Sequence, residues 1–184
     1  MTEGVWETPL GGVEIDSDLA GRIVRSSKII DVSELAHRYE HSIEVQLPFL
    51  QYLYGSEFRF VPLCMMMQDL ETSREVGEAL ASALGSRGLI IASTDLTHYE
   101  PQRSAERKDR MVVESVTRLD EAGLWTVVEG EGVSMCGYGP VIAAMVSAKK
   151  LGASRAELLK YSTSGDVSGD TREVVGYASM VLVK

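Results

Sequence analysis

LIIASTDLTHY, at residues 89–99, begins as a continuous apolar run and ends in hydroxyls, a carboxylate and an imidazole. An apolar run without alternation predicts a strand that is buried on both faces, such as a central strand of a parallel sheet. Ligands of open α/β sheets bind beyond the carboxyl ends of such strands, so Asp95 and His98 are candidate site residues. The alternative is that Asp95 only caps the next segment and that His98 is a surface histidine.

The segments before this run predict an α/β protein. Residues 58–64 are a candidate strand, and residues 72–85 have the form of a capped helix that ends at Gly85. Strand, helix and strand in this order form a βαβ unit, which predicts a mixed, largely parallel sheet flanked by helices. Residues 1–28 lack periodicity and are rich in turn formers, so an irregular loop is expected there.

The segments after the run continue the alternation of helices and strands. Pro101 suits the first turn of a long helix, and residues 120–128 fit a shorter one. Residues 158–163 and 174–183 are strand-like. The glycine-rich loop between them lacks the pattern of a phosphate loop.

The composition bounds the class of protein. With 184 residues, of which 45% are hydrophobic, the chain can form one domain with a sizeable core over residues 1–184. The net charge of −9 argues against nucleic acid as a partner, because phosphate binding needs a basic face. No apolar run reaches the roughly 18 residues that a membrane span needs. Cys64 and Cys136 form no CxxC unit, and without an export signal we expect a reduced, cytoplasmic protein.

A third segment, AHRYEHSIEVQLPFL at residues 36–50, carries two histidines and two glutamates. The spacing of its apolar residues predicts an amphipathic helix over about residues 42–53, with a kink or an early start at Pro48. His37 and His41 are four residues apart, which on a helix is a known metal-ligand geometry. The sequence is not HExxH, however, so a hydrogen-bonded support role for His41 and Glu44 is the favoured interpretation.

Cys136 lies in the stretch SMCGYGP, at residues 134–140, just ahead of an apolar helix. Pro140 is well placed at the first position of that helix, and Gly152 follows its end. The positive end of a helix dipole favours the thiolate, the form of cysteine that binds metals or attacks electrophiles. The alternative is that Cys136 is simply a small buried residue.

Four motifs in this order closely resemble the Memo family, known in prokaryotes as AmmeMemoRadiSam system protein B. They are EHSIEVQLPF at 40–49, STDLTHY at 93–99, MCG at 135–137 and SGD at 164–166. The resemblance implies a fold similar to that of the class III (LigB-type) extradiol dioxygenases, which use non-haem iron. It also implies a metal-centred pocket at one end of the sheet.

The resemblance assigns roles residue by residue. Cys136 matches the cysteine metal ligand of the MCG motif, and His98 matches the acid–base histidine of the dioxygenases, with Asp95 as its companion. His41 and Glu44 match a signature segment that supports the pocket. The two histidine ligands of the family lie before the position of Trp6 and have no counterpart here.

We therefore expect a single Memo-like domain over residues 1–184 that lacks the N-terminal part of the family fold. Iron or copper is implied for the complete family site, and no tightly held metal for this chain as it stands. An unpaired sheet edge would favour self-association, or a second polypeptide that supplies the absent part.

Three classes of function remain open. The first is a metal-dependent redox or dioxygenase-like protein that acts on a small organic molecule, with His98 moving protons. The second is a non-catalytic module that binds a peptide, or the Amme-domain protein and radical SAM enzyme named with the family. The third is a hydrolase with Cys136 as nucleophile and His98 as base, which needs the two within hydrogen-bond reach.

Overall fold

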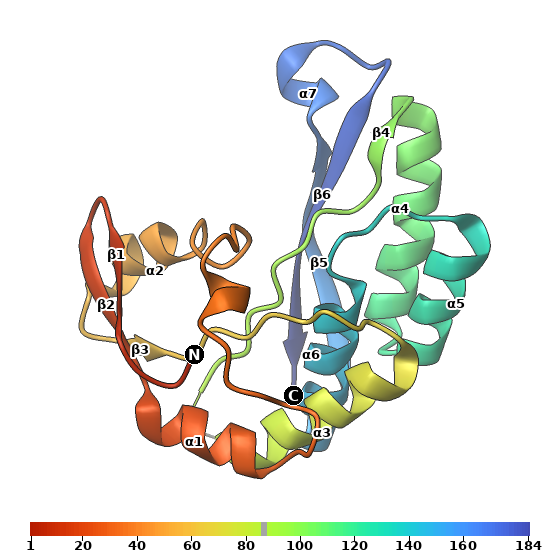
Figure 1. Cartoon of the computed structure of the whole chain (residues 1–184). Helices are drawn as coiled ribbons and strands as arrows, with labels where there is room; N and C mark the ends of the chain where they lie inside the picture. Colours follow the sequence, from red (N-terminus) through yellow and green to blue (C-terminus); the bar gives the residue numbers. More distant parts are fainter. Residues whose placement is uncertain (86–87) are drawn as a thin grey trace.

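A computed structural model describes residues 1–85 and 88–184, and it shows an α/β protein with two small sheets (Figure 1). The first sheet has the order β1-β2-β3 and the second the order β4-β6-β5. The strands are β1 (Val5–Thr8), β2 (Gly11–Ile15), β3 (Arg59–Phe60), β4 (His98–Glu100), β5 (Arg155–Thr163) and β6 (Val174–Val183). The helices are α1 (Ser17–Arg25), η1 (Leu35–His37), α2 (Leu47–Tyr54), α3 (Leu70–Leu84), α4 (Gln102–Thr117), α5 (Glu121–Glu131), α6 (Tyr138–Lys150) and α7 (Gly165–Ser168).

The second sheet forms the larger part of the core. Its long hairpin, β5 with β6, is antiparallel, and β4 pairs with the start of β6. Helices α4, α5 and α6 lie together on one side of this hairpin (Figure 1). Leu124, Ile142 and Met145 are fully buried in the cluster between these helices and the sheet.

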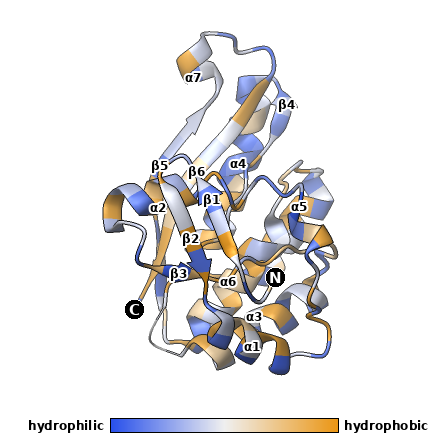
Figure 2. Cartoon of the chain, turned by 60° about the vertical axis from the view of Figure 1, so that its left-hand side comes forward, coloured by the Kyte–Doolittle hydropathy of each residue, from blue (hydrophilic) through white to orange (hydrophobic). Residues whose placement is uncertain are grey.

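A second core cluster lies where α3 crosses α6 and contacts α1. Gly77 of α3 faces the backbone of α6, and a Cβ atom there would lie 2.6 Å from the carbonyl oxygen of Ala143. Glycine therefore allows the two helices to approach closely. In Figure 2, α1 and α3 carry both hydrophobic and hydrophilic residues, as expected for helices with one face on the core.

Several predicted elements are confirmed. The long helix α4 follows Pro101 directly, α5 covers the shorter helix expected at 120–128, and β5 and β6 contain the two predicted strands. The helix after Cys136 is also present, although it begins at Tyr138, so Pro140 lies within its first turn. The loop between β5 and β6 contains the short helix α7.

The expected central strand at residues 89–93 is wrong. A strand needs a neighbour that pairs with its backbone. In the parts of the chain that the structure describes, no backbone hydrogen bond joins residues 89–95 to a strand. Backbone pairing begins only at Leu96, whose N–H donates to the carbonyl of Gly176 at 2.9 Å. Leu89 and Ile91 are 75% and 47% exposed, so the run is not buried on both faces either.

The largely parallel sheet is also wrong. Among the described residues, only β2 with β3 pairs in parallel, and the other pairings are antiparallel. The expected βαβ unit is also wrong, because its second strand was to be residues 89–93, which pair with no strand among the described residues. The mixed character of the sheet is confirmed.

The N-terminal segment is more regular than the sequence predicts. Residues 5–15 form the hairpin of β1 and β2, and α1 follows with the Asp16 side chain accepting from the N–H of Leu19. Gly11 has a φ of +111° in the tight turn, a conformation that glycine adopts without strain. The turn residues that suggested a loop therefore make a hairpin.

Two helices begin at other residues than predicted, α2 later in the sequence and α3 earlier. Helix α2 begins at Leu47 rather than near Ser42, because Pro48 is tolerated in a first turn and not in a helix interior. Helix α3 begins at Leu70, since the side chain of Asp69 and not that of Thr72 caps it. No helix in the described residues is long and apolar enough to cross a membrane.

Candidate functional site

The structure brings together the three predicted residues Asp95, His98 and Cys136. The N–H of Asp95 donates to Cys136 Sγ at 3.2 Å, and the Asp95 carboxylate lies 3.6 Å from His98 Nε2. Two segments about 40 residues apart in the sequence therefore meet at one place, with Asp95 between the thiol and the imidazole.

Cys136 lies in the turn just before α6, and side chains from two other segments hold that turn. Gln68 donates from Nε2 to the Cys136 carbonyl at 2.9 Å and accepts from the N–H of Gly139 at 2.8 Å. Thr94 Oγ1 accepts from the N–H of Gly137 at 2.8 Å. A Cβ at Gly137 would lie 2.8 Å from the carbonyl oxygen of Ser93, so this close approach requires glycine.

The thiol itself is exposed, so the alternative of a small buried cysteine does not hold. Its polar neighbours are the backbone of Asp95 and the hydroxyl of Thr94, which is 3.6 Å from Sγ. The sulfur of Cys136 thus accepts a backbone N–H, and the residue stays accessible to a ligand.

His98 is held by the same turn from the other side. Its backbone N–H donates to Ser134 Oγ at 2.7 Å, and its ring Nδ1 lies 2.7 Å from the Ser134 carbonyl oxygen. A carbonyl only accepts, so Nδ1 carries a proton and Nε2 is left to face Asp95. The His98 side chain is 21% exposed and that of Asp95 47%, so both remain accessible to a ligand.

The residue after His98 has an uncommon backbone conformation. Tyr99 has a φ of +55°, and the register of β4 against β6 shifts between His98 and Glu100. A bulge of this kind bends the strand locally and re-aims the side chains beside it. It is the local reason that His98 reaches the Ser134 turn while Tyr99 is exposed.

His41 and Glu44 lie apart from this cluster. Their side chains bond to each other, with 2.8 Å between Nδ1 and Oε1, and are 78% and 57% exposed. In the described part of the chain, no hydrogen bond joins either of them to Asp95, His98 or Cys136. Their segment is nevertheless tied to the site, because Gln46 donates to Ser93 Oγ at 3.0 Å.

The histidine pair considered as a metal site is not formed. His37 ends the short helix η1, and its ring nitrogens face the carbonyls of Ser33 and Pro62. Within residues 1–85 and 88–184, no group of three or more histidine, cysteine, aspartate or glutamate side chains is arranged to hold a metal ion.

The supporting residues Gln68, Thr94 and Ser134 were missed by the sequence analysis. Thr94 and Ser134 stand inside the motifs that predicted the site, so their positions were available as a signal. Gln68 has no such signal, because its role depends on how the segment before α3 lies against α6.

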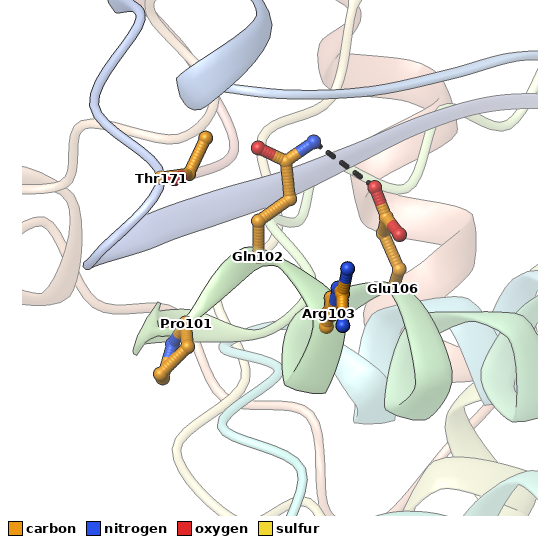
Figure 3. A pocket seen from close by; sticks show the side chains of 5 residues that line it. All are labelled: Pro101, Gln102, Arg103, Glu106 and Thr171. Carbon is orange, nitrogen blue, oxygen red and sulfur yellow. Dashed lines mark hydrogen bonds between the residues drawn. The ribbon is translucent and has the colours of Figure 1, made fainter.

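A separate hollow lies at the start of α4. It has a volume of about 440 Å³ and is lined by Pro101, Gln102, Arg103, Glu106 and Thr171 (Figure 3). Gln102 donates to Glu106 at 3.0 Å in this hollow. The lining contains no thiol and no imidazole, so it offers no counterpart to the chemistry at Cys136.

The geometry does not favour a cysteine hydrolase. A nucleophilic thiol needs its base within hydrogen-bond reach. The hydrogen bonds of the described residues join Cys136 Sγ to Asp95 and Thr94, and the ring of His98 to Ser134.

These features define an α/β protein with an accessible site made of a thiol, an imidazole and a carboxylate. A sequence profile described as Memo-like protein matches residues 1–181, and the chain belongs to this family. The family assignment from the four motifs is thereby confirmed.

Curated relatives from methanogenic archaea support the same assignment. A MEMO1 family protein of Methanopyrus kandleri is 59% identical over 184 residues, covering 98% of this chain and 65% of the relative. A MEMO1 family protein of Methanothermobacter thermautotrophicus is 51% identical, with 98% and 66% covered. One of Methanosarcina barkeri is 49% identical, with 99% and 69% covered. The chain thus spans about two thirds of the length of these relatives.

Proposed function

We propose that this Memo-family chain carries the thiolate and the acid–base groups of a metal-dependent redox site for a small organic substrate. The observation that supports this most is the position of Asp95. Its N–H binds Cys136 Sγ while its carboxylate faces His98 Nε2, so one residue couples a metal-binding group to a proton-transfer group.

The proton-transfer role follows from how His98 is held. Because Nδ1 is occupied by the Ser134 carbonyl, Nε2 is the nitrogen that exchanges a proton with a substrate. The Asp95 carboxylate, 3.6 Å away, stabilises the imidazolium that forms when Nε2 takes that proton. Both groups are partly exposed, so a small molecule can reach them.

The donor types suit iron or copper, but the described residues do not complete such a site. Thiolate and imidazole are ligands that both metals accept. A catalytic site has about three protein ligands, and the described residues contain no group of three that could hold an ion. On our proposal this chain supplies the thiolate ligand Cys136, and the further ligands are not among the described residues. An arrangement like that of the class III extradiol dioxygenases is part of the same proposal.

Metal titration tests this proposal. After dialysis against a weak chelator, the 184-residue chain should retain well below one equivalent of iron or copper. Added copper should still bind weakly, with a thiolate-to-metal absorption band that disappears in Cys136→Ser and persists in Cys64→Ser. One tightly held transition metal per chain would refute the ligand count, and an unchanged band in Cys136→Ser would refute the role of Cys136.

A second candidate function is the binding of a peptide or a companion protein, such as the Amme-domain protein or the radical SAM enzyme. The extended residues 89–95 favour it, because Leu89 and Ile91 are exposed and the backbone there lacks a strand partner within the described residues. An added strand could pair with such an edge. Loss of companion binding in Ile91→Lys, with the copper band retained, would identify this function rather than the first.

A further inference from the structure

Asp109 of α4 is a fully buried carboxyl group just behind the candidate site. Its Oδ1 accepts from the N–H of Thr97 at 3.0 Å, and its Oδ2 accepts from the hydroxyl of Tyr161 at 2.7 Å. Both oxygens are therefore acceptors, as a carboxylate requires. In the described residues, no lysine, arginine or histidine forms an ion pair with it.

Two neighbours of Asp109, Gly176 and Tyr161, accommodate its carboxyl group. A Cβ atom at Gly176 of β6 would overlap with Asp109 Oδ2, so the strand carries glycine at this point. Burial and the hydrogen bond to Asp109 raise the pKa of Tyr161 far above its usual value, which keeps the phenol a donor. A buried carboxyl without a counter-charge is costly, so it is retained where it has a specific task.

One of the hydrogen bonds of Asp109 reaches the backbone N–H of Thr97, the residue before His98. The N–H of Thr97 goes to Asp109, while the Thr97 carbonyl accepts from the N–H of Gly176 at 2.9 Å. Leu96 donates to the carbonyl of Gly176, also at 2.9 Å. The backbone between Asp95 and His98 is thus fixed from α4 on one side and from β6 on the other.

We propose that Asp109 is a positioning residue, which acts through the Thr97 amide to hold His98 and Asp95 in place. The inference rests on the proposed function, since it assigns Asp109 to the acid–base group of that site. Without the Asp109 bond, this backbone is held from β6 alone, and His98 Nδ1 is placed less firmly against the Ser134 carbonyl. The tautomer of the His98 ring is therefore the direct signature of this role.

The test uses Asp109→Asn. This substitution replaces one of the two carboxylate oxygens by an NH₂ group, which cannot accept the hydrogen bond of Thr97 or Tyr161. The ¹⁵N shifts of the His98 ring report the tautomer, and the chain has only three histidines to assign. We expect the Nδ1–H tautomer to lose its dominance. Alkylation of Cys136 should also slow, because the Asp95 N–H that binds its sulfur lies in the same backbone segment.

Val112→Ala is the matched control. Val112 is on the same helix and is 1% exposed in the main core cluster, so its truncation lowers stability without touching the Thr97 peptide. It should leave the His98 tautomer and the Cys136 rate as in the wild type. If Asp109→Asn fails to fold, Tyr161→Phe replaces it, because it removes one of the two donors and should shift both readouts in the same direction by a smaller amount.

A folded Asp109→Asn or Tyr161→Phe chain with wild-type His98 shifts and Cys136 rate would overturn the inference. Neither readout needs a metal, a substrate or turnover. A negative result for copper binding by Cys136 would therefore refute the proposed function and leave this test of Asp109 standing.

Discussion

The two cysteines differ in chemistry although both are exposed. Partial desolvation of the Cys64 sulfur and the negative charge of Glu40 raise the pKa of this thiol to about 11, against a smaller opposing effect of the N-terminal ammonium. At pH 8 only about one molecule in a thousand then carries the reactive thiolate. Cys136 instead receives the N–H of Asp95 at its sulfur.

We therefore expect iodoacetamide to modify Cys136 at least about tenfold faster than Cys64 at pH 8, as measured by mass spectrometry. The rate at Cys64 should rise tenfold with each pH unit up to about 11, because its thiolate fraction does. Cys64→Ser and Cys136→Ser show each rate separately. Equal rates at pH 8 would contradict this difference between the two sites.

At the same scale, the sequence allowed the reactive groups to be predicted but not the residues that hold them. Asp95, His98 and Cys136 stand at ends of apolar runs or before a helix, and such places are visible in a sequence. Gln68 and Asp109 act across long separations, on Cys136 and Thr97. Their roles depend on the packing of α3 and α4, which no local pattern reveals.

At the scale of elements, the close contact between α3 and α6 depends on a glycine. Gly77→Ala would place a methyl group 2.6 Å from the Ala143 carbonyl and 2.8 Å from Val146 Cβ. We expect a loss of about 1–3 kcal/mol in the free energy of unfolding, measured by urea denaturation, because the two helices must separate.

Gly130 of α5 is the matched control. A Cβ there meets nothing within 4 Å, so Gly130→Ala adds only helix propensity. It should stabilise the protein by up to about 1 kcal/mol. If both substitutions destabilised equally, the close approach at Gly77 would not be the cause.

An ion pair joins β4 to α4 just beyond the site. Glu100 accepts from Lys108 Nζ and from Ser104 Oγ, both at 2.6 Å, and the Glu100 and Lys108 side chains are 24% and 14% exposed. The hydrogen bonds from Lys108 and Ser104 lower the pKa of Glu100 below its usual 4.5. A lowered pKa in the folded state adds stability above the unfolded pKa, and that stability is lost as the pH falls through the folded pKa.

Glu100→Gln should thus cost about 1 kcal/mol at pH 7. The difference from the wild type should shrink as the pH falls below about 4.5. Urea unfolding at pH 7, 5 and 4 measures it. Glu114→Gln, at an exposed pair with Arg118, should change little at any of these pH values. If Glu100→Gln lowered the free energy of unfolding equally at every pH, the loss would come from altered packing and not from the charge of Glu100.

Elements with their own start and stop signals were predictable, and those that depend on a partner were not. Helix α4 follows Pro101, and α5 begins after Asp120, whose side chain accepts from the N–H of Gly123. The run at residues 89–93 has the apolar composition of a central strand. Its state depends on a neighbouring strand, which is absent among the described residues, and local sequence carries no information on that.

For the whole molecule, residues 89–93 matter most, because no backbone hydrogen bond in the described parts of the chain joins them to a strand. Extended backbone with free hydrogen-bonding groups and exposed apolar side chains is a template for pairing with another chain. Leu89 and Ile91 supply the exposed apolar side chains. The sequence analysis also expected self-association, but from a sheet edge left unpaired by the missing N-terminal part of the family fold.

Ile91→Lys tests this expectation by placing a charge on the unpaired segment. We expect the wild type to show a concentration-dependent rise in mass by analytical ultracentrifugation, because pairing of two such segments buries Leu89 and Ile91. The lysine should shift this association to higher concentrations, since a charge on an edge opposes pairing. Val167→Lys on α7 is the control, because Val167 is 91% exposed but lies in a short helix rather than an unpaired strand. An equal effect of both lysines would mean that net charge, and not the segment at 89–93, governs the association.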